Sequence, residues 1–172
     1  HKIKISQMLK NWLFVFIGNL IGAIFIAAMV AVSGLFDSIA DTVISTATTK
    51  ANLDFFTALL RGVLCNFLVC IAVWMATAAT TVSGKIIAVF LPIMLFVLCG
   101  FEHSIANSFF IPAGMITGAI NDLAAPTISQ FFLGNLLPVT LGNIIGGSIL
   151  VGCSYYLAYR PPKKLPRDSS QN

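Results

Sequence analysis

Four long apolar stretches follow one another along the chain, and short segments that hold most of its charged residues separate them. The stretches cover residues 11–36, 55–82, 86–120 and 131–159. A helix that crosses a bilayer needs about 20 apolar residues, each adding about 1.5 Å. The first, second and fourth stretches therefore each predict one membrane-spanning helix.

The third stretch is too long for a single helix. About 35 residues would form a helix of roughly 50 Å. Inside it lie Gly100, Glu102, His103, Asn107 and Pro112. We therefore expect a broken helix with halves over 86–100 and 107–119. Because non-helical backbone at this depth is tolerated only beside protein or a water-filled cavity, the break is a candidate functional centre.

Composition supports a membrane protein. The chain is 58% hydrophobic, only 9% charged and has a mean hydropathy of +0.93, whereas charged residues make up about a quarter of a soluble domain. A soluble protein with a very large core is the alternative, and the uncharged runs disfavour it. The net charge of +4 comes from residues at the flanks of the stretches, so no nucleic-acid partner is expected.

The cysteines do not predict a metal site. Cys65, Cys70, Cys99 and Cys153 all lie inside apolar runs without C-x-x-C spacing, and a buried free cysteine acts as a small hydrophobic residue. We expect neither a metal nor a cofactor.

Basic residues predict the orientation in the membrane. They cluster before the first stretch, between the second and third, and after the fourth, whereas the other two linkers are acidic and hold only Lys50. By the positive-inside rule, both termini and the Lys85 turn are cytoplasmic. We thus expect a transmembrane domain over residues 1–160 and a cytoplasmic tail over 161–172.

The beginning of the first stretch recurs in the fourth at a constant offset. The pairs are Asn11 and Asn135, Val15 and Val139, Gly18 and Gly142, Asn19 and Asn143, Ile21 and Ile145, and Gly22 and Gly146. Glycines on one helix face let backbones approach closely. Because the first copy starts inside and the second outside, the pattern is typical of an inverted repeat; chance similarity between glycine-containing helices is the alternative.

This repeat predicts that part of the fold lies upstream. The second copy is the third span of a three-span unit, so the first copy should also close such a unit. We expect two further spans before His1, and therefore a six-span protein of which this chain lacks the first two.

The segment G-F-E-H-S-I-A-N holds the ionisable residues at membrane depth. A charge at the bilayer centre costs several kcal/mol, so such residues usually face a cavity and act there. His103 suits a pore because its ordinary pKa of ~6.5 lets it exchange protons near neutrality. We expect Glu102 to satisfy loop amides, and the helix N-terminus at 105–108 to favour an anion. A purely structural Glu102–His103 pair is the alternative.

Three polar residues outside this segment are further candidates. Asn66 could line the pore or hydrogen-bond between helices. Arg61 is expected to anchor its span at the interface. Lys50 is a candidate to attract anions into an outer vestibule.

Four motifs in order resemble the formate/nitrite transporter family of small-anion channels. They are N-W-L-F-V-F-I-G-N-L-I-G-A, R-G-V-L-C-N-F-L-V-C-I-A-V-W-M, G-F-E-H-S-I-A-N-S-F-F-I-P and N-L-L-P-V-T-L-G-N-I-I-G-G. The resemblance implies an all-α, aquaporin-like protomer with an inverted three-helix repeat and broken pore helices. It also implies that the domain over residues 1–160 is a channel in the inner (plasma) membrane and that the protein is a homopentamer with one pore per protomer.

The resemblance also implies roles for single residues. His103 corresponds to the central pore histidine, with Glu102 and Asn107 in the same pore loop. Asn66 corresponds to a polar pore-lining residue and Lys50 to the vestibule lysine. The two constriction positions match Phe96 and Val69. The family's other broken helix would lie upstream of this chain.

The predicted function is a channel or transporter for small monovalent anions of weak acids, such as formate, nitrite or hydrosulfide. A structural or assembly subunit without flux of its own is the alternative. An intramembrane zinc protease needs H-E-x-x-H, and His1 is the only other histidine, which also disfavours twin-histidine ammonia channels. We expect no enzymatic activity.

Overall fold

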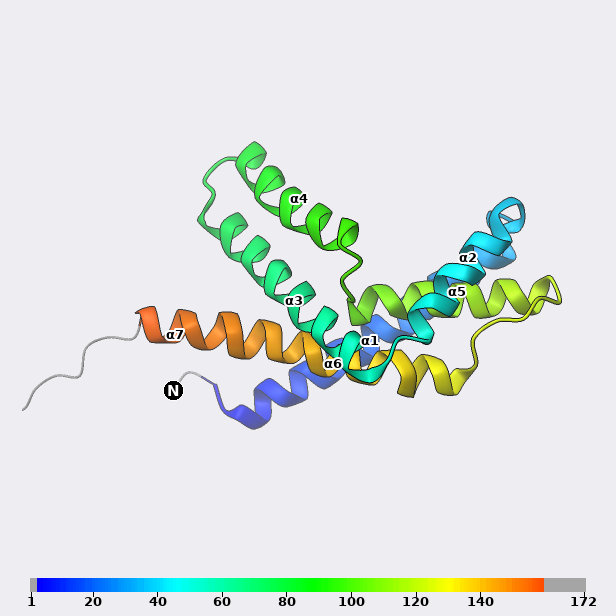
Figure 1. Ribbon diagram of the computed structural model, residues 1–172. Coiled ribbons are helices and arrows are strands. Elements are labelled where there is room, and N and C mark those ends of the chain that lie inside the picture. Colours follow the sequence, from blue (N-terminus) through cyan, green and yellow to red (C-terminus); the bar gives the residue numbers. More distant parts are fainter. Residues whose placement is uncertain (1–2, 160–172) are drawn as a thin grey trace, which may run out of the picture.

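The computed structural model describes residues 3–159, in which every regular element is a helix (Figure 1). The predicted tail over 161–172 lies outside the described residues. Three helices are long and apolar enough to cross a membrane: α1 (Ile5–Val32), α3 (Phe55–Ala78) and the continuous run Gln130–Tyr159. This run consists of η2 (Gln130–Leu136), α6 (Leu137–Ile144), η3 (Ile145–Cys153) and α7 (Ser154–Tyr159).

The third apolar stretch is broken, as its length and polar residues predict. It forms α4 (Val82–Leu98) and α5 (Ser104–Ile120), so the non-helical part runs from Cys99 to His103. Gly100 lies in the left-handed region at φ 66°, which glycine adopts without steric cost. Pro112 is buried inside α5, within the predicted second half of the broken helix.

The linker over residues 37–54 holds a helix that the sequence did not predict. A short turn, η1 (Asp37–Ile39), leads into α2 (Ala40–Ala51), which packs along α5 (Figure 1). Its buried face is made of Ile44, Ala47 and Ala51. Asp54 then caps α3, and hydrogen bonds from Thr57 hold the pKa of this carboxyl below its ordinary value.

The continuous run Gln130–Tyr159, called here the last helix, is held on α3 by close backbone approach. A Cβ atom added at Gly142 or Gly146 would meet backbone atoms of Leu59 or Val63 on α3. Lipid supplies no hydrophobic force between helices, so dense packing of this kind provides the attraction instead. The glycines of the second repeat copy therefore fix the position of the last helix.

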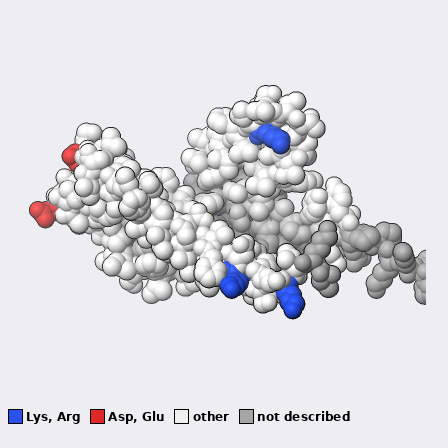
Figure 2. Space-filling view, turned by 180° about the vertical axis from the view of Figure 1, so that it is seen from behind, with Lys and Arg blue, Asp and Glu red and all other residues white. Residues whose placement is uncertain are grey.

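Most large apolar side chains lie on the outside, as expected for a chain surrounded by lipid and other helices. The buried cluster is small and consists of Ala51, Ile111, Phe131 and Leu136. Only 6% of the most apolar window of α1 is buried. Figure 2 shows Lys and Arg towards one end of the molecule and acidic residues at the other. That separation agrees with the charge pattern from which the orientation was predicted.

Candidate pore site

The Glu102 carboxylate lies in a buried polar network that joins α2, the break, α5 and η2. Its side chain is 3% exposed, and Oε1 lies 3.0 Å from Nζ of Lys50 on α2. Oε2 accepts a hydrogen bond from Nδ2 of Asn107 and lies 3.5 Å from Nδ2 of Asn135. A buried carboxylate is tolerated only when it is paired and hydrogen-bonded, and this one meets both conditions.

The same network ties α2 to the last helix. Nδ2 of Asn107 also donates to Oδ1 of Asn135 at 2.8 Å, and Nδ2 of Asn135 donates to the carbonyl of Lys50 at 2.8 Å. Residues from α2, the break, α5 and η2 thus share one set of hydrogen bonds. The predicted vestibule residue Lys50 has a side chain that is one-fifth exposed, and Nζ also lies 5.7 Å from the ring centroid of Phe110.

Asn143 holds the backbone of the break. Its Oδ1 accepts the N–H of Ser104 at 3.0 Å, while Nδ2 donates to the carbonyls of Glu102 at 3.0 Å and Gly62 at 2.8 Å. The side chain therefore ties the α5 end of the break, on both sides of His103, to α3. Glu102 was expected to satisfy these loop amides. Its carboxylate instead bonds side chains. Asn143, a position of the internal repeat, accepts the N–H of Ser104.

His103 caps α5 with its ring. Nδ1 accepts a hydrogen bond from the backbone N–H of Ala106 at 3.2 Å. Accepting this bond uses the Nδ1 lone pair, so the neutral ring carries its proton on Nε2. The ring also stacks on Phe96, with centroids 6.1 Å apart and planes inclined by 24°. The N–H groups of Ser104 and Ala106 are already bonded, so the α5 N-terminus is less open to an anion than the sequence suggests.

A cavity of about 500 Å³ lies between α1 and the last helix, beside the break. Its lining comprises Asn11, Trp12, Leu13, Val15, Phe16, Asn19, Asn66, His103, Ser104, Ile105, Thr140, Asn143, Ile144 and Ser148. By area the wall is mostly apolar, although eight of the fourteen lining residues carry an amide, hydroxyl or imidazole group. The Thr140 Oγ1 atom is buried without a hydrogen-bond partner in the described part of the chain.

The structure separates the predicted site residues into two groups. His103 and Asn66 line the cavity, and Nδ2 of Asn66 also donates to the carbonyl of Asn143 at 2.6 Å. Asn66 therefore lines this cavity and also forms a hydrogen bond between helices. Glu102, Asn107 and Lys50 belong to the buried polar network and do not line the cavity. Phe96 reaches His103 through the stacked rings, and Val69 is half-buried on α3.

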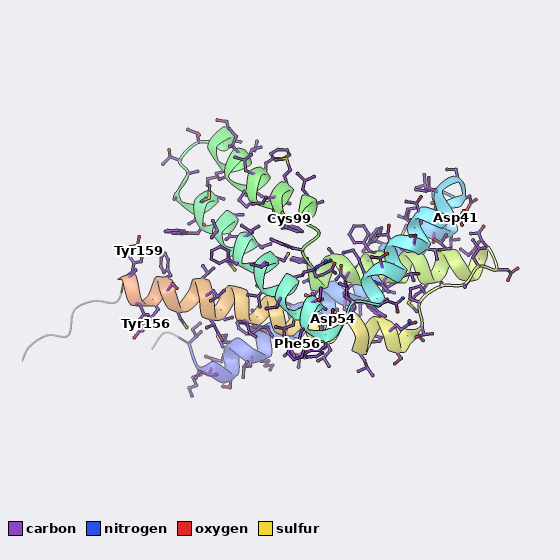
Figure 3. All side chains as sticks on the ribbon, in the orientation of Figure 1. Asp41, Asp54, Phe56, Cys99, Tyr156 and Tyr159 are labelled. Carbon is purple, nitrogen blue, oxygen red and sulfur yellow. The ribbon has the colours of Figure 1, made fainter. Side chains whose placement is uncertain are left out.

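All four cysteines are free thiols. Cys99 is exposed where α4 ends, next to the break (Figure 3). Within residues 3–159, no group of three or more His, Cys, Asp or Glu side chains could hold a metal ion.

Known proteins match this chain over nearly its whole length. The family model for formate/nitrite transporters matches residues 1–157. A probable formate transporter of Methanothermobacter thermautotrophicus is 41% identical and covers 92% of this chain, which spans 62% of that relative. The formate channel FocA of Escherichia coli (strain K12) is 38% identical, with 92% of this chain and 61% of that protein covered. The chain thus spans about three fifths of the length of these relatives.

Solved structures share the fold. One, described as a pentameric formate channel with formate bound, superposes with a TM-score of 0.82 at 33% identity, covering 92% of this chain and 69% of that chain. A second, described as an FNT family ion channel, has a TM-score of 0.81 at 29% identity and covers 93% and 62%. These matches confirm the predicted all-α membrane architecture.

Proposed function

This chain belongs to the formate/nitrite transporter family, and from that premise we propose that it forms the larger part of a pore for small monovalent anions of weak acids, such as formate, nitrite or hydrosulfide. The relatives named above are described as channels or transporters rather than enzymes. The observation that carries the proposal is the position of His103, whose imidazole lines the cavity at the break of a membrane helix.

The physical problem is to pass an anion through an apolar neck. Moving a bare ion into a medium of low dielectric costs tens of kcal/mol in the ideal limit, and a protonated weak acid avoids most of that cost. The stacked Phe96 ring and Val69 form the proposed constriction, which excludes bulk water. Within the cavity the anion meets an N–H donor from His103 or Asn66 in place of water.

His103 is the proposed proton donor. In its neutral form, Nε2–H donates a hydrogen bond to an oxygen or sulfur atom of the anion. Full transfer starts from the doubly protonated ring, in which Nδ1 no longer accepts the bond from Ala106. The Nε2–H bond then breaks as the acid's O–H or S–H bond forms, and a neutral ring remains. The acid crosses uncharged, and His103 regains a proton from the aqueous side.

The Lys50–Glu102 pair keeps the surroundings of this histidine electrically balanced. One positive and one negative side chain lie 3.0 Å apart behind the break, so their charges largely cancel at the cavity. A change of protonation at His103 is then the main change of charge in the site. Because its side chain is 20% exposed, Lys50 remains the proposed vestibule residue that attracts anions from outside.

The proposed assembly is a homopentamer with one pore per protomer, in the plasma membrane and with both termini cytoplasmic. The solved structure at 33% identity is described as pentameric, and the separated charges of this chain support the orientation. We further propose that a preceding two-span segment of the same protein completes the pore.

Anion flux tests the proposal. Liposomes containing the full-length protein should take up formate, nitrite or hydrosulfide far faster than protein-free liposomes, and faster at acidic pH. Absence of flux for all three anions in correctly folded pentamers would contradict it, and would favour a structural or assembly subunit.

A further inference from the structure

The two copies of the internal repeat have the same key residues but different contacts. In the second copy, Gly142 and Gly146 lie directly against the α3 backbone. In the first copy, the matching Gly18 and Gly22 on α1 have no atom within 4 Å of an added Cβ. A glycine face that packs a helix in one copy is therefore open in the other.

The asparagines differ in the same way. Asn143 makes three hydrogen bonds to the backbone of α3 and the break. Its counterpart Asn19 is exposed and donates only to the carbonyl of Val15, four residues earlier in its own helix, at 2.8 Å. Both asparagines line the same cavity, from opposite helices. The amide oxygen and the second N–H of Asn19 thus have no hydrogen-bond partner in the described part of the chain.

We infer that the Gly18–Asn19–Gly22 face of α1 is the binding surface for the segment that precedes this chain, and that Asn19 is a positioning residue for a second helix break in that segment. This inference rests on the proposal that such a segment completes the pore. A span equivalent to α3 packs on Gly18 and Gly22. Asn19 donates to a carbonyl in the second break and accepts the N–H of the residue two positions later, as Asn143 does with Glu102 and Ser104.

Other occupants of this face fit less well. Lipid chains would leave the amide oxygen and the second N–H of Asn19 without partners at membrane depth, where each unsatisfied polar group costs several kcal/mol. A second copy of this chain offers α3 as the matching surface, but Gly142 and Gly146 of its own last helix already cover that surface. The repeat supports an upstream segment, because the first copy should also close a three-span unit, and this chain spans only 62% and 61% of two relatives.

The inference has a consequence for the pore. With Asn143 bracing one break and Asn19 the other, both breaks meet at the cavity that His103 lines. The cavity is then closed by two sets of interrupted backbone related by the repeat. Backbone groups of the second break would face His103 across the path of the anion.

Hydrogen–deuterium exchange of the full-length protein tests the inference without any transport measurement. Asn19→Leu should raise amide exchange in the upstream break by about tenfold or more and leave residues 104–107 as in the wild type. Asn143→Leu should instead raise amide exchange over residues 104–107 and leave the upstream break as in the wild type. Ile17→Ala is the matched control, because Ile17 and its repeat counterpart Leu141 are both 41% exposed and Ile17 lies across the helix from Asn19.

The reciprocal pattern decides the outcome. If Asn19→Leu changed no upstream amide while Asn143→Leu raised exchange over 104–107, Asn19 would have no positioning role. A cryo-electron microscopy structure of the wild-type full-length protein avoids any folding defect of the variants. It should place the Asn19 amide within hydrogen-bond distance of upstream backbone, and lipid or empty space there would overturn the inference. Either result is independent of whether the protein carries anions.

Discussion

Nζ of Lys50 lies 3.0 Å from Oε1 of Glu102, although the two residues are 52 positions apart in the chain. The lysine comes from α2 and the glutamate from the helix break, so the pair fixes α2 against the centre of the membrane domain. The two partners are not equally buried: the lysine side chain is 20% exposed and the glutamate side chain 3%. Their substitutions should therefore have unequal effects.

Lys50→Met should destabilise the full-length protein more than Glu102→Gln does. The first change leaves a carboxylate buried without its cation, which typically costs about 3–5 kcal/mol. After the second change, Lys50 can turn its ammonium group towards water. Thermal unfolding in detergent would measure both variants. The double variant should recover part of the loss, and equal, additive losses would contradict a direct pairing.

Replacing His103 with Phe should uncouple anion flux from pH. The phenyl ring keeps the apolar bulk beside Phe96 but offers no proton to the anion, so flux should fall and lose its rise at acidic pH. Flux in liposomes over about two pH units around the ordinary histidine pKa of ~6.5 is the measurement. Phe96→Leu serves as the control because it leaves His103 in place. A wild-type pH profile in the His103 variant would eliminate the proton-donor role.

Gly146→Ala should weaken the protein, whereas Gly152→Ala should be nearly neutral. A methyl group at Gly146 would overlap the carbonyl of Val63, while at Gly152 the nearest atom, the carbonyl of Gly147, is 3.5 Å away. Overpacking of this kind costs about 1–3 kcal/mol. The yield of folded pentamer and its unfolding temperature would compare the two variants. Equal behaviour would show that the last helix does not depend on backbone contact with α3.

Gly100→Ala should destabilise the break through backbone strain alone. Gly100 has φ 66°, and no atom lies within 4 Å of an added Cβ. The left-handed conformation costs a residue with a Cβ roughly 1–2 kcal/mol. Gly100→Asn is the control because asparagine tolerates this conformation better. The unfolding temperature should order the proteins as wild type, Asn variant, Ala variant, and an Ala variant as stable as wild type would refute the strain.

The number and positions of the apolar helices could be predicted from the sequence, because bilayer thickness sets the length of an apolar run and a charged residue interrupts it. The break beside Glu102 and His103 follows from the same reasoning. Four ordered motifs identified the family, and the family match over residues 1–157 confirms it. The helix α2 was missed because its linker is mixed in polarity, and its burial depends on contact with α5 rather than on a local apolar pattern.

What each polar side chain bonds was decided by the tertiary structure. The sequence marked Asn143 only as a repeat position, yet it braces the break through residues 39 and 41 positions away. Lys50 looked like a free cation because its partner is distant in the chain. Local composition determines where a helix can run or stop, since those choices depend on neighbouring residues. Hydrogen bonds between distant segments depend on how helices pack, so only the folded chain shows that His103 faces the cavity while Glu102 lies behind it.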